Sequence, residues 1–117
     1  MKILMIINDP PYGSEKTYNA LRLAMAIQKG YGDAEITVFL MGDAVVCALP
    51  EQSTPEGFYN IERMLKSIIK KGGRVKTCMT CLSVRGMLET KLMDGAELGT
   101  IDQLAELTIQ TDKIISF

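Results

Sequence analysis

The most reactive side chains in this sequence are two cysteines at short spacing. Cys78 and Cys81 are separated by two residues. A thiol becomes a nucleophile when its thiolate is stabilised, and unpaired backbone N–H groups in the first turn of a helix provide that stabilisation. Lys76 and Arg85 would add positive charge nearby. We therefore predict a reactive thiol in this segment, with burial of both cysteines as small hydrophobic residues as the structural alternative.

Metal binding and disulfide exchange are the other uses of a CxxC spacing. A tetrahedral zinc site needs further ligands, but the chain has no histidine and only one more cysteine, Cys47. Cys47 lies in the apolar stretch 44–49, so we expect it to pack in the core. A thioredoxin-like motif has a tryptophan before it and Gly-Pro inside, and this chain has no tryptophan. Glycine-rich phosphate loops are also absent, so we predict no metal and no cofactor.

The composition is that of a small protein with no strong charge bias. The chain has 117 residues, of which 47% are hydrophobic, enough for the core of one domain. Its 13 basic and 14 acidic residues create no field that would attract nucleic acid or an anionic membrane. The apolar run at residues 3–7 is too short for a signal peptide, and three cysteines, an odd count, suit a reducing compartment. We expect a cytoplasmic protein with a single domain over residues 1–117.

Strands and helices should alternate along the chain. Runs rich in apolar and β-branched residues predict strands, at residues 3–7, 35–41, 74–77 and 113–117. Apolar residues at helical spacing predict helices, at residues 15–29, 61–69 and 100–110, with a shorter one at 42–49. In the stretch 87–99, Met87 and Leu92 fit a helix, whereas Gly95 and Gly99 interrupt one, and a short strand is the alternative. The order predicts a three-layer α/β/α fold with a mostly parallel sheet of about five strands.

Three loops should meet at the carboxyl edge of this sheet, where parallel sheets gather their ligands. Each follows a predicted strand, and they span residues 8–13, 41–43 and 78–81. Tyr12 and Gly13 either line the same site or form a turn before the next helix. Asp43 is either a polar site residue or the N-cap of the short helix. Arg85 pairs either with a sulfur anion or with a surface carboxylate. These four are the candidate supporting residues for the cysteine pair.

Nine short stretches, spread over nearly the whole chain, carry a further signal in their order. They are Pro11-Tyr12-Gly13-Ser14-Glu15, Leu21-Arg22-Leu23-Ala24, Phe39-Leu40-Met41-Gly42-Asp43-Ala44-Val45, Tyr59-Asn60-Ile61, Cys78-Met79-Thr80-Cys81, Arg85-Gly86, Asp94-Gly95, Glu97-Leu98-Gly99-Thr100 and Asp112-Lys113-Ile114-Ile115-Ser116-Phe117. Each is weak by itself. Together and in this order, they resemble the DsrE/DsrF-like family and, within it, the YchN-like branch.

The resemblance implies a three-layer α/β/α fold and a role in sulfur relay. In the better understood relatives, a cysteine eight residues before the glycine of an Arg-Gly pair accepts sulfane sulfur as a persulfide and passes it to a partner protein. Cys78 stands eight residues before Gly86, so the role carries to Cys78. Cys81 matches only the YchN-like branch. Relatives are also similar in forming ring-like hexamers, so the resemblance implies a homo-oligomer, expected as a hexamer, that exchanges sulfur with donor and acceptor proteins.

Three functions remain open from the sequence. The leading hypothesis is a sulfur carrier or sulfurtransferase, in which the Cys78 thiolate attacks the outer sulfur of a donor persulfide or polysulfide and Cys81 resolves the product. The second is an oligomeric assembly or small-ligand-binding module without sulfur transfer. The third is a dithiol oxidoreductase, in which both cysteines are equally indispensable. Replacement of Cys78 by serine separates the first two, because only a carrier loses sulfur transfer.

Overall fold

Five parallel strands form one sheet in the computed structural model, which describes residues 1–117. They are β1 (Lys2–Ile7), β2 (Glu35–Leu40), β3 (Arg74–Cys78), β4 (Ala96–Gly99) and β5 (Lys113–Ser116). Their order in the sheet is β4-β3-β2-β1-β5, and every neighbouring pair is parallel. Parallel neighbours require long crossover connections, usually through a helix. The predicted α/β class with a parallel, five-stranded sheet is confirmed.

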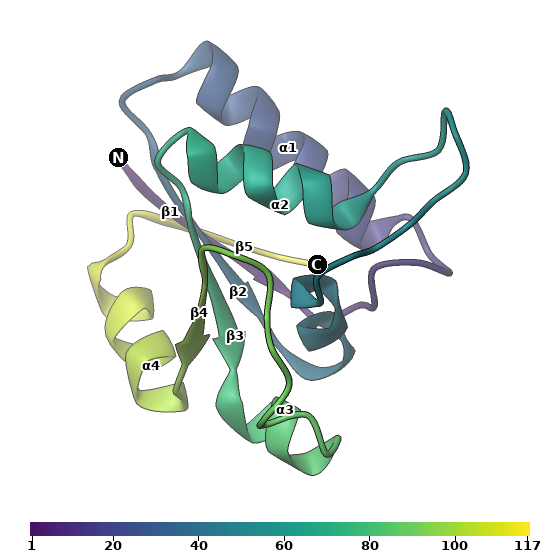
Figure 1. Ribbon diagram of the computed structural model, residues 1–117. Helices are drawn as coiled ribbons and strands as arrows, with labels where there is room; N and C mark the ends of the chain where they lie inside the picture. The colour runs from purple at the N-terminus through teal and green to yellow at the C-terminus, as the bar shows by residue number, and fades with distance from the viewer.

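Helices cover both faces of the sheet. They are α1 (Lys16–Gly30), the 3₁₀ helix η1 (Gly42–Ala48), α2 (Ile61–Lys70), α3 (Met79–Val84) and α4 (Ile101–Gln110). Figure 1 shows α1 and α2 on one face and α4 on the other, which makes the three predicted layers. η1 and α3 follow directly after β2 and β3 at the carboxyl edge of the sheet. None of these helices combines the length and the apolar character needed to cross a bilayer.

The core is divided between the two faces of the sheet. The larger part lies against α1 and α2 and includes Met5, Leu21 and Leu65. The strand β1 also contributes to the smaller part through Leu4, because successive side chains of a strand point to opposite faces. This smaller part consists of Leu4, Phe39, Val45, Cys78, Leu82 and Leu104. A strand that is buried on both faces has an unbroken run of apolar residues in its sequence, and β1 has such a run.

Residues 87–99 do not form the helix that Met87 and Leu92 suggest. The short strand β4 forms at the end of this stretch instead, as the alternative allowed. Gly95 has a φ of +88°, which a right-handed helix does not contain. A Cβ at Gly99 would lie 2.7 Å from Cζ of the buried Phe39. The two glycines thus permit a backbone path beside β3 that a residue with a side chain would obstruct.

Candidate functional site

Cys78 ends β3 and occupies the N-cap position of α3. Its Sγ accepts a hydrogen bond from the N–H of Cys81 at 3.2 Å. The residue is 5% exposed and packs in the smaller part of the core with Phe39 and Leu82. β3 therefore places the Cys78 thiol at the carboxyl edge of the sheet. One backbone N–H contacts its sulfur, and its other surroundings are mostly apolar.

Cys81 lies in the first turn of α3 and is only partly buried. Its Sγ accepts a hydrogen bond from the N–H of Gly42, the first residue of η1, at 3.2 Å. Gly42 has a φ of +55°, in the left-handed region that favours glycine. A Cβ at this position would lie 3.7 Å from the carbonyl oxygen of Asn8. The loops that follow β1 and β2 therefore meet beside the more exposed of the two thiols.

An ion pair between Arg85 and Asp43 joins the same segments. Nε and Nη2 of Arg85 donate to Oδ1 of Asp43 at 3.2 and 2.9 Å. Nη1 donates to the carbonyl oxygen of Cys81 at 3.0 Å. Asp43 lies in the first turn of η1, but Met41 is the N-cap, so the N-cap alternative for Asp43 is wrong. The Arg85 guanidinium therefore binds a carboxylate and a carbonyl oxygen, as in the alternative that pairs Arg85 with a surface carboxylate.

The pKa of the Cys78 thiol is raised above its ordinary value of 9.0. Burial is the largest cause, and a hydrogen bond with the Cys81 side chain and repulsion from a charged Cys81 add to it. The N–H groups of Cys81 and Thr80 lower the pKa, but they do not outweigh burial. Lys76 pairs with Glu97, with 3.6 Å between Nζ and Oε2. Burial therefore outweighs the stabilisation of a Cys78 thiolate that we expect from the helix N-terminus, and Cys78 is a protonated thiol at neutral pH.

Cys47 takes no part in this group. It is fully buried in the larger part of the core. Burial raises the pKa of its thiol to about 12, so the nucleophilic thiolate is scarce at neutral pH. The predicted packing role of Cys47 is confirmed.

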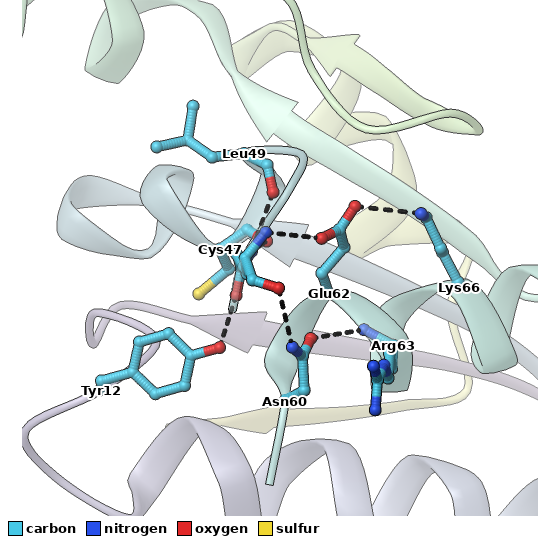
Figure 2. Close-up of polar contacts among 8 residues, drawn as sticks. Tyr12, Cys47, Leu49, Asn60, Glu62, Arg63 and Lys66 are labelled. Atoms are coloured by element: carbon cyan, nitrogen blue, oxygen red, sulfur yellow. Dashed lines mark hydrogen bonds and ion pairs between the residues drawn. The ribbon is translucent and has the colours of Figure 1, made fainter. Parts of the chain in front are cut away.

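Tyr12 and Gly13 belong to a different group of contacts. The hydroxyl of Tyr12 donates to Oε1 of Gln52 at 2.6 Å and accepts from the N–H of Ile61 at 3.1 Å. Figure 2 shows Tyr12 among the polar contacts that connect η1 and the segment after it to the start of α2. Gly13 lies beside aromatic side chains of the α1 and α2 layer. No hydrogen bond joins either residue to the cysteine pair. Of the four candidate supporting residues, the structure brings Asp43 and Arg85 to that pair.

The backbone N–H of Gly42 is a site group that sequence reasoning missed. It contacts a thiol directly, although its side chain contributes nothing. The available signal was a glycine immediately after a predicted strand, in a loop already assigned to the carboxyl edge of the sheet. Glycine at that place predicts an unusual backbone conformation, but the direction of its N–H follows only from the folded loop.

The arrangement is suited to sulfur–sulfur exchange. Two thiols lie within one turn of the chain, Cys78 buried and Cys81 more accessible. Each sulfur accepts a hydrogen bond from a backbone N–H, which can stabilise negative charge that develops on the sulfur during exchange. No cluster of three histidine, cysteine, aspartate or glutamate side chains is arranged to hold a metal ion.

Comparison with known sequences gives matches over the whole chain. A model of the DsrE/DsrF-like family matches residues 1–117. Protein YchN of Escherichia coli strain K12 is 41% identical over 116 residues, which covers 99% of this chain and 98% of that protein. An uncharacterized protein of Methanocaldococcus jannaschii is 36% identical over 118 residues, which covers 100% of both chains.

Comparison with solved structures agrees. The crystal structure of the ychN protein from E. coli matches with a TM-score of 0.94 and 41% identity, and the match covers 99% of this chain and 98% of that one. A protein of unknown function from Methanobacterium thermoautotrophicum matches with a TM-score of 0.79 at 12% identity, over 99% of this chain and 97% of that one. At that identity the second match concerns the fold alone.

Proposed function

We propose that this chain, which belongs to the DsrE/DsrF-like family, carries sulfane sulfur as a persulfide on Cys78 and passes it to a partner protein. The family is associated with sulfur relay. The observation that carries the proposal is the position of Cys78, a thiol at the carboxyl end of β3 whose Sγ accepts the Cys81 N–H at 3.2 Å. This contact favours negative charge on the sulfur that has to attack.

Loading exchanges one sulfur–sulfur bond for another. The Cys78 thiolate attacks the outer sulfur of a donor persulfide, a new bond forms between Sγ and that sulfur, and the donor's own sulfur–sulfur bond breaks. The donor leaves as a thiolate and takes up the proton that Cys78 lost. The products are a Cys78 persulfide and a donor thiol, with no external oxidant or reductant. Because Cys78 rests as a protonated thiol, removal of its proton is part of the cost of this step.

Delivery repeats the exchange with the roles reversed. A thiolate of the acceptor protein attacks the outer sulfur of the Cys78 persulfide, and Cys78 leaves with the electron pair of the broken bond. Cys81 offers a competing route, in which its thiolate attacks the inner sulfur of the persulfide. That route forms a disulfide between Cys78 and Cys81 and releases hydrosulfide.

A transfer assay tests the proposal. The protein is loaded with a small-molecule persulfide that carries radiolabelled outer sulfur, desalted, and mixed with a thiol acceptor. Label should reach the acceptor from the wild type and from Cys47→Ala, the internal control, but not from Cys78→Ser. Label transfer that survives Cys78→Ser would refute Cys78 as the carrier, and no transfer from the wild type would leave the ligand-binding or assembly alternative. Equal loss in Cys78→Ser and Cys81→Ser would indicate a dithiol exchange site instead.

A further inference from the structure

The guanidinium of Arg85 lies next to the cysteine pair and is oriented by the backbone. Its Nη1 donates to the carbonyl oxygen of Cys81 at 3.0 Å. Its Nη2 lies 4.0 Å from the position that a Cβ on Gly42 would occupy. The N–H of Gly42 in turn contacts the Cys81 sulfur, and the N–H of Cys81 contacts the Cys78 sulfur, each at 3.2 Å. A short chain of contacts therefore connects this positive charge to both thiols.

The other edge of the guanidinium is held by an exposed carboxylate. Nε and Nη2 both donate to one oxygen of Asp43, Oδ1, at 3.2 and 2.9 Å, and the second oxygen, Oδ2, accepts no hydrogen bond. The side chain of Asp43 is 67% exposed, and that of Arg85 is 30% exposed. Two N–H donors on one edge of a guanidinium match a carboxylate or a similar anion. Because an exposed pair of this kind adds little to stability, replacement of Asp43 by another anion costs little.

The charges near the thiols decide what kind of donor is admitted. The pair of Arg85 with Asp43 is neutral, and Lys76 has its own partner in Glu97. Displacement of Asp43 leaves Arg85 as a cation without a counterion. The Cys78 thiolate that attacks is itself negative, so it repels an anionic donor unless a cation lies close to that donor. An anion that takes the place of Asp43 meets such a cation beside the site.

We propose, in an inference that rests on the proposed sulfur-carrier function, that Arg85 binds the carboxylate of a small persulfide donor and directs the donor's outer sulfur to Cys78. Asp43 occupies this subsite before the donor arrives and competes with it. During loading the bond between Cys78 Sγ and the outer sulfur forms while the donor's sulfur–sulfur bond breaks. The donor leaves as a thiolate that takes up the Cys78 proton. The guanidinium keeps its charge throughout, because arginine does not deprotonate in proteins.

Two donors that differ in one charge test this subsite. They are the persulfides of N-acetylcysteine and of its amide, in which a neutral amide replaces the carboxylate. The rate of sulfur loading is measured against donor concentration by intact mass, for the wild type, Arg85→Gln and Asp43→Ala. Lys91→Gln and Asp33→Ala are the matched controls for the loss of one charge, since both side chains are exposed and make no ion pair. Circular dichroism and thermal melts confirm that every variant folds.

The two variants should change the loading rate in opposite directions with the carboxylate donor. Arg85→Gln should lower the second-order rate constant on the order of tenfold to a hundredfold, through weaker donor binding, because a charge-assisted pair is lost. Asp43→Ala should raise it about two- to fivefold, because the competing carboxylate is gone. With the amide donor both variants should load like the wild type, and the two controls should do so with either donor.

The result with the two donors separates this inference from the function on which it rests. Equal slowing of both donors in Arg85→Gln, or no slowing of the carboxylate donor, would overturn the subsite while Cys78 remained the carrier. Slower loading of Asp43→Ala by the carboxylate donor would also overturn it, since Asp43 would then assist the donor. A wild type that neither donor loads would overturn the carrier function and the subsite together.

Discussion

At the scale of single residues, the protonation of Cys78 governs how the site reacts. Burial raises the pKa of this thiol, and the neighbouring Cys81 raises it further, while two backbone N–H groups oppose both. The balance favours the thiol form at rest. A buried thiol of raised pKa is protected from indiscriminate oxidation and alkylation, since the thiolate is the reactive species.

Substitution of Cys81 by alanine should lower the pKa of Cys78. The change removes the hydrogen bond with the Cys81 side chain and the repulsion from a charged Cys81, while the N–H of residue 81 stays in place. Thiolate reacts with iodoacetamide and thiol does not, so the alkylation rate of Cys78 rises with pH through its pKa. The midpoint of that rise, followed by peptide mass spectrometry, should lie at lower pH in Cys81→Ala than in the wild type. An unchanged or higher midpoint would contradict the assigned causes.

The cysteine pair was predictable from sequence, but its electrostatics were not. The CxxC spacing directly after a predicted strand located both thiols, and the same topological reasoning placed the loop of Asp43 at the same edge of the sheet. The ion pair between Asp43 and Arg85 was not predicted. The sign of the pKa shift at Cys78 depends on how far burial outweighs two N–H contacts, and both quantities follow from the folded packing. Tyr12 failed to join the pair because its hydroxyl reaches Gln52 and Ile61 instead.

At the scale of elements, the segment between η1 and α2 is held by the backbone and side chain of Gln52. Its Nε2 donates to the carbonyl oxygens of Cys47 and Leu49 at 2.9 Å each. Its N–H donates to Oε1 of Glu62 in the first turn of α2 at 2.8 Å, and Lys66 Nζ lies 3.0 Å from Oε2 of the same carboxylate (Figure 2). These contacts anchor a segment that has little regular structure to the helix that follows it.

Glu62→Gln should reduce stability in a pH-dependent way. Burial raises the pKa of Glu62, but Lys66 and the N–H groups of Gln52 and Glu51 outweigh it and lower the pKa below its ordinary value of 4.5. A carboxylate whose pKa is lower in the folded than in the unfolded state stabilises the fold at pH above the unfolded-state pKa. This stabilisation is lost as the pH falls through the folded-state pKa. Urea unfolding should show a loss of about 1 to 2 kcal/mol at neutral pH.

The difference between wild type and Glu62→Gln should shrink as the pH is lowered below 4.5. Glu56→Gln is the control, because Glu56 is exposed and makes no ion pair. Its effect should stay within about 0.5 kcal/mol at every pH. A Glu62→Gln difference that is constant with pH would show that the charge of Glu62 is not the stabilising feature.

Gly99→Ala should destabilise the pairing of β3 with β4 next to the site. The new Cβ would lie 2.7 Å from Cζ of Phe39 and 3.3 Å from Cβ of Lys76, and Phe39 is fully buried. Overpacking of this kind costs about 1 to 3 kcal/mol. Gly32→Ala is the matched control, because no atom lies within 4 Å of its Cβ position and its φ is not in the left-handed region. Equal stability of the two variants, measured by urea unfolding, would contradict this packing.

Most elements followed from the periodicity of apolar residues. α2 and the strand β1 were the clearest, because each buries a defined set of side chains that repeats at the spacing of its backbone. The stretch 87–99 was ambiguous because Met87, Leu92 and Met93 pack against the core from an irregular segment. Close contact of Gly99 with Phe39 is a tertiary constraint that no local pattern in the sequence encodes.

At the scale of the whole molecule, the parallel topology of the sheet determines where the sulfur site lies. The carboxyl edge gathers the loops after β1, β2 and β3, and Cys78 ends the third of these strands. α1 and α2 cover one face of the sheet and α4 covers the other (Figure 1), and Leu104 of α4 packs in the same part of the core as Cys78.

Intact mass after sulfur loading tests the central claim most directly. The wild type, Cys47→Ala, Cys78→Ser and Cys81→Ser are each incubated with a small-molecule persulfide, desalted and weighed by mass spectrometry. We predict a gain of about one sulfur atom in the wild type, Cys47→Ala and Cys81→Ser, and no gain in Cys78→Ser. A wild type that gains no mass and stays fully reduced, or a Cys78→Ser variant that gains the same mass, would contradict Cys78 as the sulfur carrier.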